Sequence, residues 1–228
     1  MIMKEWNDIP LHFRNSSVKP YYDSLTRKKY SLISKRIFDI VFSAILLVVL
    51  FPIFLVICIL IRLDSEGPIF FRQVRITQYG RKFMIFKFRT MFRNAENIGS
   101  QITQFNDSRV TRIGAKLRGY RLDEIPQLIN ILLGDMTFVG TRPEVEKYVN
   151  MYNEEMLATL LLPAGVTSEA SIQYKDEEKY LKDAVNIDKV YVEIVLPEKM
   201  KYNLESTKKI NFVNDFAILL KTVLAVIK

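Results

Sequence analysis

The amino-acid sequence predicts a mixed α+β protein attached to a membrane, and three observations support this prediction. Residues 40 to 61 form a run of 22 residues without a charge, which at about 1.5 Å per residue reaches across a hydrocarbon core of about 30 Å. Two runs rich in β-branched and aromatic residues follow it, with a short turn between them. Helical patterns dominate the remainder of the 228 residues.

Composition limits the chemistry that the chain can perform. The 33 Lys and Arg residues exceed the 25 Asp and Glu residues, which favours nucleic acid, anionic lipid or phosphorylated small molecules as partners. The single cysteine, Cys58, lies in the apolar run, so an internal disulfide is excluded and no metal-ligand spacing exists. The only histidine, His12, lies in the polar N-terminal stretch, away from any catalytic triad in the body. Chemistry must therefore use carboxylates and basic groups.

The apolar run predicts a helix that enters the membrane and returns. Its basic flanks are Arg27, Lys28, Lys29, Lys35 and Arg36 before it, and Arg62, Arg72 and Arg75 after it. Both flanks are expected on the cytoplasmic side, which Lys and Arg favour. Phe51 and Pro52 mark the kink, because a proline breaks or bends a helix. We therefore expect a lead-in at the membrane surface (1–34), a re-entrant membrane helix (35–62) and a cytoplasmic catalytic body (63–228).

Two other interpretations of the run compete with the re-entrant helix. An ordinary kinked spanning helix stays open, because prolines are common in such helices. A cleaved signal peptide is disfavoured, because the run begins well inside the chain and lacks an A-x-A-like site after it.

Asp39 is costly in lipid and needs a partner, for which Arg36 is a candidate.

A β-hairpin is expected next. The runs "GPIFFRQVRI" and "KFMIFKFRTM" are separated by "TQYGR", with Gly80 in the turn. Alternation places Phe86 and Phe88 on one face, and Lys87 and Arg89 on the other. A solvated strand face opposite an ordinary core accounts equally well for this basic row.

The remaining elements are predicted from the positions of loop-forming and helix-ending residues and from helical periodicity. Residues 92–110 read as a loop, and two short helices follow, the second covering 123–133 and ending at Gly134. Further helices are expected at 144–160, at 187–204 with an interruption near Pro197, and at 211–227. The last has an apolar stripe made of Phe212, Phe216, Leu219, Leu220, Val223 and Ile227. This stripe either packs on the core or lies on the bilayer surface.

Two adjacent acids, Asp123 and Glu124, stand out in this basic chain. Pro126 belongs in the first turn of a helix, which makes Asp123 the expected N-cap and places Glu124 in the first turn. Stabilisation of the helix alone would explain both carboxylates.

The basic surroundings suggest chemistry as well. Arg118 and Arg121 lie just upstream, and Lys87 and Arg89 are available from the hairpin. A helix N-terminus with arginines nearby is a phosphate site. Carboxylates fit there if Mg²⁺ bridges carboxylate and phosphate, and a carboxylate can also attack phosphorus. The composition therefore permits phosphoryl transfer at a membrane surface.

A second candidate segment is "GDMTFVGTRPEVE". It contains Asp135, Arg142, Pro143 and Glu144 beside two glycines that allow tight turns. Arg142 could contact a phosphate in bidentate fashion. A structured turn without a functional role accounts for the same pattern.

Several separated motifs together carry a resemblance to a known family. They are "KRIFDI" before the run broken at Pro52, then "GPIFFRQVR", "KFRTM" and "RLDEIPQLINILLGDMTFVGTRPE". In this order and spacing, from about Lys35 to the C-terminus, the chain resembles the bacterial sugar transferases, or monotopic phosphoglycosyl transferases. The resemblance implies a helix-break-helix inserted in one leaflet from the cytoplasmic face of the bacterial inner membrane. It also implies an α+β body with amphipathic surface helices around the active site.

The resemblance implies a reaction too. A sugar 1-phosphate would pass from a UDP-sugar donor to polyprenyl (undecaprenyl) phosphate, with release of UMP, as the first membrane step of surface glycan assembly. Asp123 would form a covalent phosphosugar intermediate, with Mg²⁺ at Asp123 and Glu124, and Glu124 would assist. Lys87, Arg89 and Arg118 would bind phosphate.

The segment from Arg142 to Glu144 would line the nucleotide-sugar site, and Asp135 is a further candidate for substrate binding. The chain departs from the family pattern at Phe51, where serine is frequent, at Ile76 and Thr77, and at Ala164, Ser168 and Glu169. These departures bear on kink geometry and donor preference.

Two other classes of function compete with this reading. A membrane-anchored binding or scaffold protein would use the acids only as helix caps. A nucleic-acid binder is disfavoured, because no recognition motif appears and the charge is dispersed. Inner-membrane lipids are expected partners, and homo-oligomerisation stays open.

Overall fold

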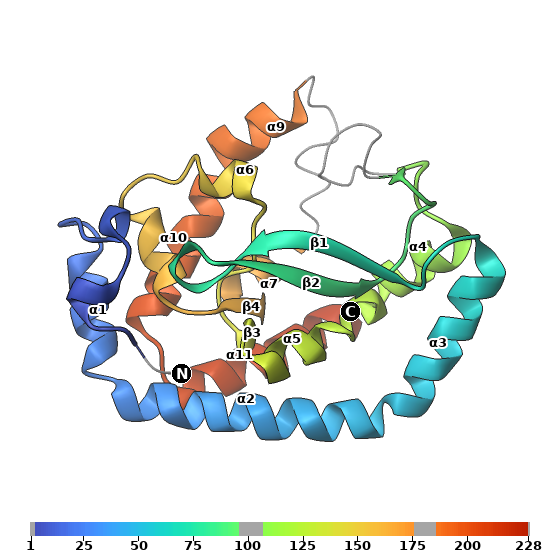
Figure 1. Ribbon diagram of the computed structural model, residues 1–228, viewed down its shortest axis with the longest axis horizontal. Helices are drawn as coiled ribbons and strands as arrows, with labels where there is room; N and C mark the ends of the chain where they lie inside the picture. The colour runs from blue at the N-terminus through green and yellow to red at the C-terminus, as the bar shows by residue number, and fades with distance from the viewer. Residues whose placement is uncertain (1–2, 96–106, 176–185, 228) are drawn as a thin grey trace.

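The computed structural model describes residues 3–95, 107–175 and 186–227, and within them the protein has the mixed α+β architecture that the sequence predicts. A long bent helix pair runs along one side of the molecule, and a twisted hairpin crosses its middle (Figure 1). The longer helices are α1 (Lys19–Thr26), α2 (Lys29–Val49), α3 (Phe51–Asp64), α4 (Arg112–Gly119), α5 (Gln127–Leu133), α10 (Leu196–Lys208) and α11 (Phe212–Ile227). The shorter helices are α6 (Glu146–Val149), α7 (Glu169–Gln173) and α9 (Ile187–Val190). The strands are β1 (Phe70–Ile76), β2 (Lys82–Phe88), β3 (Met136–Val139) and β4 (Ala164–Thr167).

Helices α2 and α3 meet at a bend of 62°. Leu50 is the cap residue between α2 and α3, and Pro52 lies in the first turn of α3, where a missing N–H leaves no hydrogen bond unmade. The predicted bend is confirmed, and the break lies at Leu50, immediately before Phe51 and Pro52. Within the described residues no single helix is long and apolar enough to cross a membrane, whereas the bent pair taken together is.

Buried polar contacts attach α2 to the body. Asp39 accepts hydrogen bonds from the Thr137 hydroxyl at 2.7 Å and from the Phe138 N–H at 3.2 Å. The expected partner, Arg36, instead donates to the carbonyls of Ile131 and Leu132 at the end of α5. The Arg36–Asp39 pairing was therefore a wrong prediction, because the unpaired carbonyls at the helix C-terminus attract the guanidinium.

Helix α11 is held to α2 by a salt bridge of 2.5 Å between Lys35 and Asp215. Its stripe divides: Leu219 packs against the core cluster around β3, while other stripe residues are exposed. The exposed large apolar residues of α11 are Phe212, Val213, Phe216, Leu220, Val223 and Leu224. Helices α2 and α3 expose a similar series from Ile37 to Leu63. Apolar surface on this scale is typical of proteins that contact a membrane or a partner.

The predicted hairpin is confirmed, with β1 and β2 antiparallel and Phe70 opposite Phe88. Its turn contains Tyr79 and Gly80, both at positive φ, which glycine adopts without strain. The alternative of a solvated strand face is not confirmed: Lys87 shares its strand face with Phe83 and Ile85, which are buried in the cluster that includes α5 residues. Of the basic row, Lys87 pairs with Glu124, and Arg89 donates to the carbonyls of Ser65 and Glu66.

Two helices differ in their boundaries from the prediction. Helix α5 begins at Gln127, so Asp123 lies in a preceding 3₁₀ turn, Leu122–Glu124, and is not the N-cap. Gly134, at φ 91°, ends α5 as expected. The single helix expected at 144–160 is wrong: α6 and a 3₁₀ segment, Met156–Leu161, replace it. Just before that segment, Oδ1 of Asn153 accepts a hydrogen bond from the Met156 N–H at 2.9 Å.

The run from α9 to α10 is helical throughout the expected range. A π-helical segment, Tyr191–Val195, joins the two helices immediately before Pro197, which lies in the first turn of α10. The predicted interruption near Pro197 thus takes the form of a π segment. Most of the loop expected at 92–110 lies outside the described residues.

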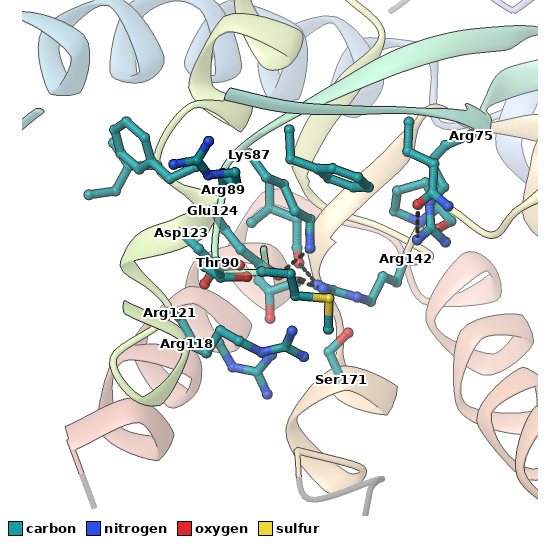
Figure 2. Close-up of a pocket in the computed structure, with 18 of the residues that line it drawn as sticks. Arg75, Lys87, Arg89, Thr90, Arg118, Arg121, Asp123, Glu124, Arg142 and Ser171 are labelled. Atoms are coloured by element: carbon teal, nitrogen blue, oxygen red, sulfur yellow. Dashed lines mark hydrogen bonds and ion pairs between the residues drawn. The ribbon is translucent and has the colours of Figure 1, made fainter. Parts of the chain in front are cut away.

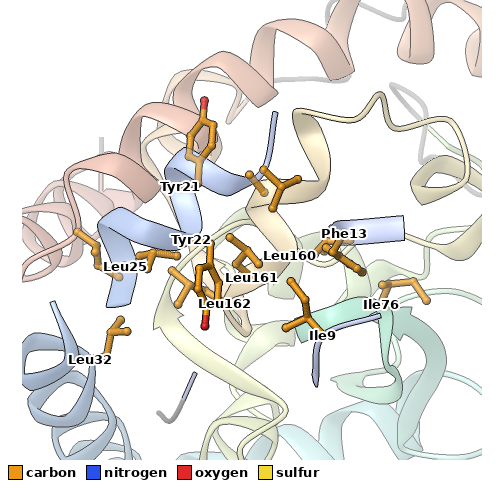
Figure 3. Packing of buried hydrophobic residues seen from close by; sticks show 13 residues of the cluster. Ile9, Phe13, Tyr21, Tyr22, Leu25, Leu32, Ile76, Leu160, Leu161 and Leu162 are labelled. Carbon is orange, nitrogen blue, oxygen red and sulfur yellow. The ribbon is translucent and has the colours of Figure 1, made fainter. Parts of the chain in front are cut away.

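The N-terminal residues form part of a core cluster. Ile9, Phe13, Val18 and Leu25 are fully buried, packed around Leu161 (Figure 3). The sequence boundary placed at residue 34 falls inside α2, which begins at Lys29. The lead-in is therefore packed against the body, and its place relative to a membrane stays a prediction.

Candidate active site

A cavity of about 1490 Å³ opens between the hairpin, the α4–α5 connection and the loop after β3. Charged side chains from these elements converge at one part of it (Figure 2). Those lining it include Arg75, Lys87, Arg89, Arg118, Arg121, Asp123, Glu124, Arg142, Glu144 and Lys199. Its wall also contains apolar residues of the bent pair and of α11, among them Leu46, Leu50 and Val223. The cavity therefore joins a strongly polar region to an apolar one.

Asp123 lies in the cavity wall on the 3₁₀ turn. The turn follows Arg121, whose backbone adopts the left-handed conformation with φ 56°, a strained state for a non-glycine residue. Asp123 is 7% exposed, and none of the described residues donates a hydrogen bond to its carboxylate. Burial raises the pKa of Asp123, the charge of Lys87 opposes that rise, and the charge of Glu124 adds to it. Asp123 is thus a buried carboxylate that accepts no hydrogen bond from the described residues.

Glu124 has the opposite environment. Its Oε1 accepts from Nη2 of Arg142 at 2.5 Å and from Nζ of Lys87 at 3.1 Å. Burial alone would raise the pKa of Glu124, but Arg142 and Lys87 outweigh burial and hold it below its usual range. The two adjacent acids therefore differ: Glu124 is neutralised by cations, while Asp123 faces the cavity.

Lys87 is positioned by a side chain that the sequence reasoning missed. Asn130 of α5 is fully buried; it accepts from the Phe86 N–H at 2.9 Å and donates to the Met84 carbonyl at 2.8 Å. These bonds fix β2 against α5 and bring Lys87 beside Glu124. Burial lowers the pKa of Lys87, and the carboxylate of Glu124 opposes that change.

Arg142 is positioned by the parallel pairing of β3 and β4. The Gly140 N–H donates to the Thr167 carbonyl at 2.9 Å, and the Gly165 N–H donates to the Thr141 carbonyl at 2.8 Å. A Cβ on Gly165 would lie 2.2 Å from the backbone of Gly140, so only glycine permits this approach. The loop then turns Arg142 toward Glu124 (Figure 2).

Arg118 lies on α4, which is anchored at its beginning. Thr111 caps α4 by accepting from the Gly114 N–H at 3.0 Å, and Asp64 at the end of α3 accepts from the Ile113 N–H at 3.0 Å. A Cβ on Gly114 would lie 2.0 Å from the Thr90 carbonyl oxygen. The positive charge of Arg118 acts on Asp123, whose pKa it lowers. The bent helix pair thus contacts the element that carries this arginine.

Two of the residues singled out in the sequence have other partners. Arg89 lines the cavity, but its guanidinium donates to the carbonyls of Ser65 at 2.6 Å and Glu66 at 3.0 Å, just past the end of α3. Asp135 does not line the cavity; it forms a salt bridge of 2.8 Å with Arg81 beside the hairpin turn. The structure therefore does not bring Asp135 to the site, because Gly134 turns the chain away before β3.

The structure adds residues beyond those expected. Arg75 lines the cavity and donates to the Pro143 carbonyl at 3.2 Å, while Tyr191 donates to Oε1 of Glu144 at 2.5 Å. Lys199 lies beside that pair. Alternation along β1 was the one local signal in the sequence that could have placed Arg75 in the cavity wall. No local signal indicated Tyr191 and Lys199, because their contacts are long-range.

The carboxylates of this site could hold a divalent cation only if a bound substrate supplied further oxygen atoms. Within the described residues, no three His, Cys, Asp or Glu side chains come together as a metal site. Mg²⁺ is commonly held by one or two carboxylates plus phosphate oxygens, and the uncommitted carboxylate of Asp123 fits that role. Glu124 would contribute if its contacts with Lys87 and Arg142 loosened.

Comparisons with known proteins show which proteins the chain is similar to. A relative in Aeromonas hydrophila, UDP-N-acetylgalactosamine-undecaprenyl-phosphate N-acetylgalactosaminephosphotransferase, is 42% identical over 54% of this chain and 29% of its own length. UDP-glucose:undecaprenyl-phosphate glucose-1-phosphate transferase of Xanthomonas campestris pv. campestris is 32% identical over 88% of this chain and 40% of its own length. The protein of that name in Escherichia coli K12 is 36% identical over 75% of this chain and 36% of its own length. The chain therefore spans less than half the length of these relatives.

The family assignment rests on a match that extends over most of the sequence. The model of the family described as "Bacterial sugar transferase" matches residues 30–228. This range includes the bent helix pair except Lys29, and every charged residue named above in the cavity wall. The resemblance carried by the sequence motifs is thereby confirmed: the chain belongs to the bacterial sugar transferase family.

Proposed function

We propose that this protein transfers a sugar 1-phosphate from a UDP-sugar to undecaprenyl phosphate and releases UMP. The observation that carries the proposal is the buried carboxylate of Asp123, which has no hydrogen-bond donor among the described residues and lies among Lys87, Arg118 and Arg142. Family membership and the names of the relatives support the same reaction class. The reaction would be the first membrane step of surface glycan assembly.

The reaction would proceed in two displacements at one phosphorus atom. A carboxylate oxygen of Asp123 attacks the phosphorus that carries the sugar, and the bond from this phosphorus to the oxygen of the nucleoside phosphate breaks. UMP departs with that electron pair, and the sugar phosphate remains on Asp123 as an acyl phosphate. A phosphate oxygen of the lipid then attacks the same phosphorus, and the acyl phosphate bond breaks. The carboxylate of Asp123 is regenerated without net proton transfer.

The cations around Asp123 have separate parts in this scheme. Lys87 and Arg142 lie on the Glu124 side, where they can stabilise charge on the transferring phosphoryl group. Arg118 acts on Asp123 from α4 and, with Arg121, would receive the departing phosphate. Glu124 holds Lys87 and Arg142 in place between turnovers.

Mg²⁺ is the cofactor that we propose for this site, where Asp123 and Glu124 would hold it together with the bound donor. When bound, it would neutralise charge that develops on the diphosphate. The cationic residues of the chain would orient the donor. Chelation with EDTA is expected to stop turnover, and added Mg²⁺ to restore it.

The acceptor would reach the site from the bilayer. We infer that α2 and α3 insert into one leaflet from the cytoplasmic face, since both flanks are basic and the pair is bent by 62°. Their exposed apolar residues would lie in lipid, as would the exposed stripe of α11. The cavity wall includes Leu46 and Leu50 near the bend, where a polyprenyl chain would pass.

The test is a turnover assay with the full chain in detergent or lipid nanodiscs. Protein is incubated with Mg²⁺, undecaprenyl phosphate and a panel of UDP-sugars, and UMP release is followed. Release that depends on both the donor and the lipid is expected. Absence of release with every donor, from protein that unfolds cooperatively, would favour a membrane-anchored scaffold instead.

A further inference from the structure

We propose that Glu144, Tyr191 and Lys199 form the subsite that recognises the donor's sugar ring. This inference rests on the proposed function, because it assigns one end of the same donor site. All three residues line the cavity that contains Asp123. Tyr191 and Lys199 come from the helical run after residue 186, which the sequence motifs did not connect with the site.

The three side chains form a buried polar group. Tyr191 donates to Oε1 of Glu144 at 2.5 Å, and Nζ of Lys199 lies 3.2 Å from the Tyr191 hydroxyl and 3.8 Å from Oε1 of Glu144. Their exposed fractions are 8%, 2% and 6% for Glu144, Tyr191 and Lys199. Buried ions are costly, and replacing such a pair by apolar residues is often stabilising. Fold stability alone is therefore a weak reason for this group.

Arg75 places the group close to the reacting phosphate. Its guanidinium donates to the Pro143 carbonyl, between Arg142 and Glu144 in the chain, at 3.2 Å, and its charge acts on Glu144, Arg142 and Lys87. Its Nε is buried without a partner in the described residues, and a buried donor without an acceptor is unfavourable. A donor phosphate or sugar oxygen next to Arg142 would supply that acceptor. The group thus lies one side chain away from the contacts of the transferring phosphoryl group.

The charge distribution indicates which end of the donor lies here. The departing nucleoside phosphate gains negative charge and requires cations, which Arg118, whose charge acts on Asp123, and Arg121 in the cavity wall can provide. A sugar ring is uncharged and presents several hydroxyls, each both donor and acceptor. A carboxylate, a phenol and an ammonium supply acceptors and donors with nearly balanced charge. The rings of Tyr148 and Tyr191, 4.8 Å apart, add an apolar surface for the C–H groups of a sugar.

The backbone at Tyr191 is π-helical, a rare conformation that occurs frequently at functional sites. Tyr191 begins the π-helical segment that interrupts an otherwise α-helical run. The segment turns Tyr191 and, eight residues later, Lys199 toward the same carboxylate. Different side chains at these positions would alter the pattern of donors and acceptors, and hence the preferred sugar.

The experiment compares affinity for the whole donor with affinity for its nucleotide part. The full chain in nanodiscs, as wild type, Tyr191→Phe, Lys199→Met and Lys147→Met, is titrated with UMP and with the best UDP-sugar of the panel. Lys147 is the control: it is close to the group and pairs with Asp188 at 2.5 Å, but it does not line the cavity. Thermal unfolding verifies that each variant is folded, and Tyr191→Phe, which removes one hydroxyl, provides the test if Lys199→Met does not fold.

The proposal predicts that Tyr191→Phe and Lys199→Met weaken UDP-sugar binding at least tenfold and change UMP binding less than twofold, with Lys147→Met like the wild type. A variant whose order of preferred UDP-sugars changes would support it as well. Equal loss of UMP affinity, or unchanged affinity for both ligands, would overturn it. Because binding is measured without turnover, a protein that binds UDP-sugar through these residues but transfers nothing would contradict only the proposed function.

Discussion

Arg142 donates to Glu124 across 2.5 Å, whereas the neighbouring carboxylate of Asp123 has no hydrogen-bond donor among the described residues. Two acids adjacent in sequence thus have different protonation behaviour: cations hold the pKa of Glu124 low, and burial raises the pKa of Asp123. Pairs whose environments separate their pKa values in this way are characteristic of catalytic acids and nucleophiles. In the proposed reaction, this difference favours Asp123 over Glu124 as the attacking group.

Replacing Asp123 with Asn should abolish turnover without loss of stability. Asparagine cannot form the acyl phosphate, so UMP release should fall by at least about a thousandfold. Because burial raises the pKa of Asp123, ionising this carboxylate costs the folded protein stability relative to the unfolded chain, and the melting temperature of the Asn variant should stay equal or rise. A helix-cap role would instead predict retained activity and a loss of up to about 2 kcal/mol.

Replacing Glu124 with Gln should destabilise the protein in a pH-dependent way. The change leaves Lys87 and Arg142 without their carboxylate and should cost about 1 to 3 kcal/mol of unfolding free energy at pH 7. The folded-state pKa of Glu124 is lowered, so its stabilising effect is complete above its unfolded value of about 4.3 and decreases as the pH falls below that value. Chemical denaturation at several pH values measures this. A difference between wild type and variant that grows toward low pH would contradict it.

Replacing Lys87 with Met should shift the acidic limb of the pH profile of kcat/KM to higher pH. Asp123 must be ionised to attack, and Lys87 lowers the pKa of Asp123. Without that cation the carboxylate ionises at higher pH, so kcat/KM should rise with pH later than in the wild type. Lys82→Met is the control, because Lys82 lies on the same strand but pairs with Glu146 outside the cavity. An unshifted limb in Lys87→Met would refute the assignment.

Replacing Asp39 with Ala should weaken the attachment of the bent pair to the body. The Thr137 hydroxyl and the Phe138 N–H would both lose their acceptor in a buried environment, at about 1 to 3 kcal/mol for each group. Strand β3 leads directly to Arg142, so turnover should fall as well. The control is Asp23→Ala, which removes only an exposed helix pair with Lys19. Equal melting temperatures for the two variants would show that Asp39 is not an anchor.

Local patterns allowed much of the fold to be predicted. Alternation with Gly80 at the turn predicted the hairpin, and Pro52 marked the bend between α2 and α3. Helix α11 followed from its period, and Gly134 marked the end of α5. Each of these features is determined within a few residues of sequence.

What the sequence missed depends on long-range contacts. Strands β3 and β4 have four residues each and pair across a long connection, so no periodicity reveals them. Asp123 failed as an N-cap because the left-handed Arg121 inserts a 3₁₀ turn before α5. Asp135 pairs with Arg81, and Tyr191 reaches Glu144, across separations of 54 and 47 residues. Motif spacing gives no geometry over such distances.

The most direct test of the central claim is to trap the intermediate on Asp123. The full chain is incubated with Mg²⁺ and a UDP-sugar without lipid acceptor, quenched, and examined by peptide mass spectrometry while UMP is counted. We expect a burst of UMP that approaches one equivalent, and the mass of one sugar phosphate on the peptide containing Asp123. Protein that turns over when lipid is added, yet never carries this mass on Asp123, would contradict the account.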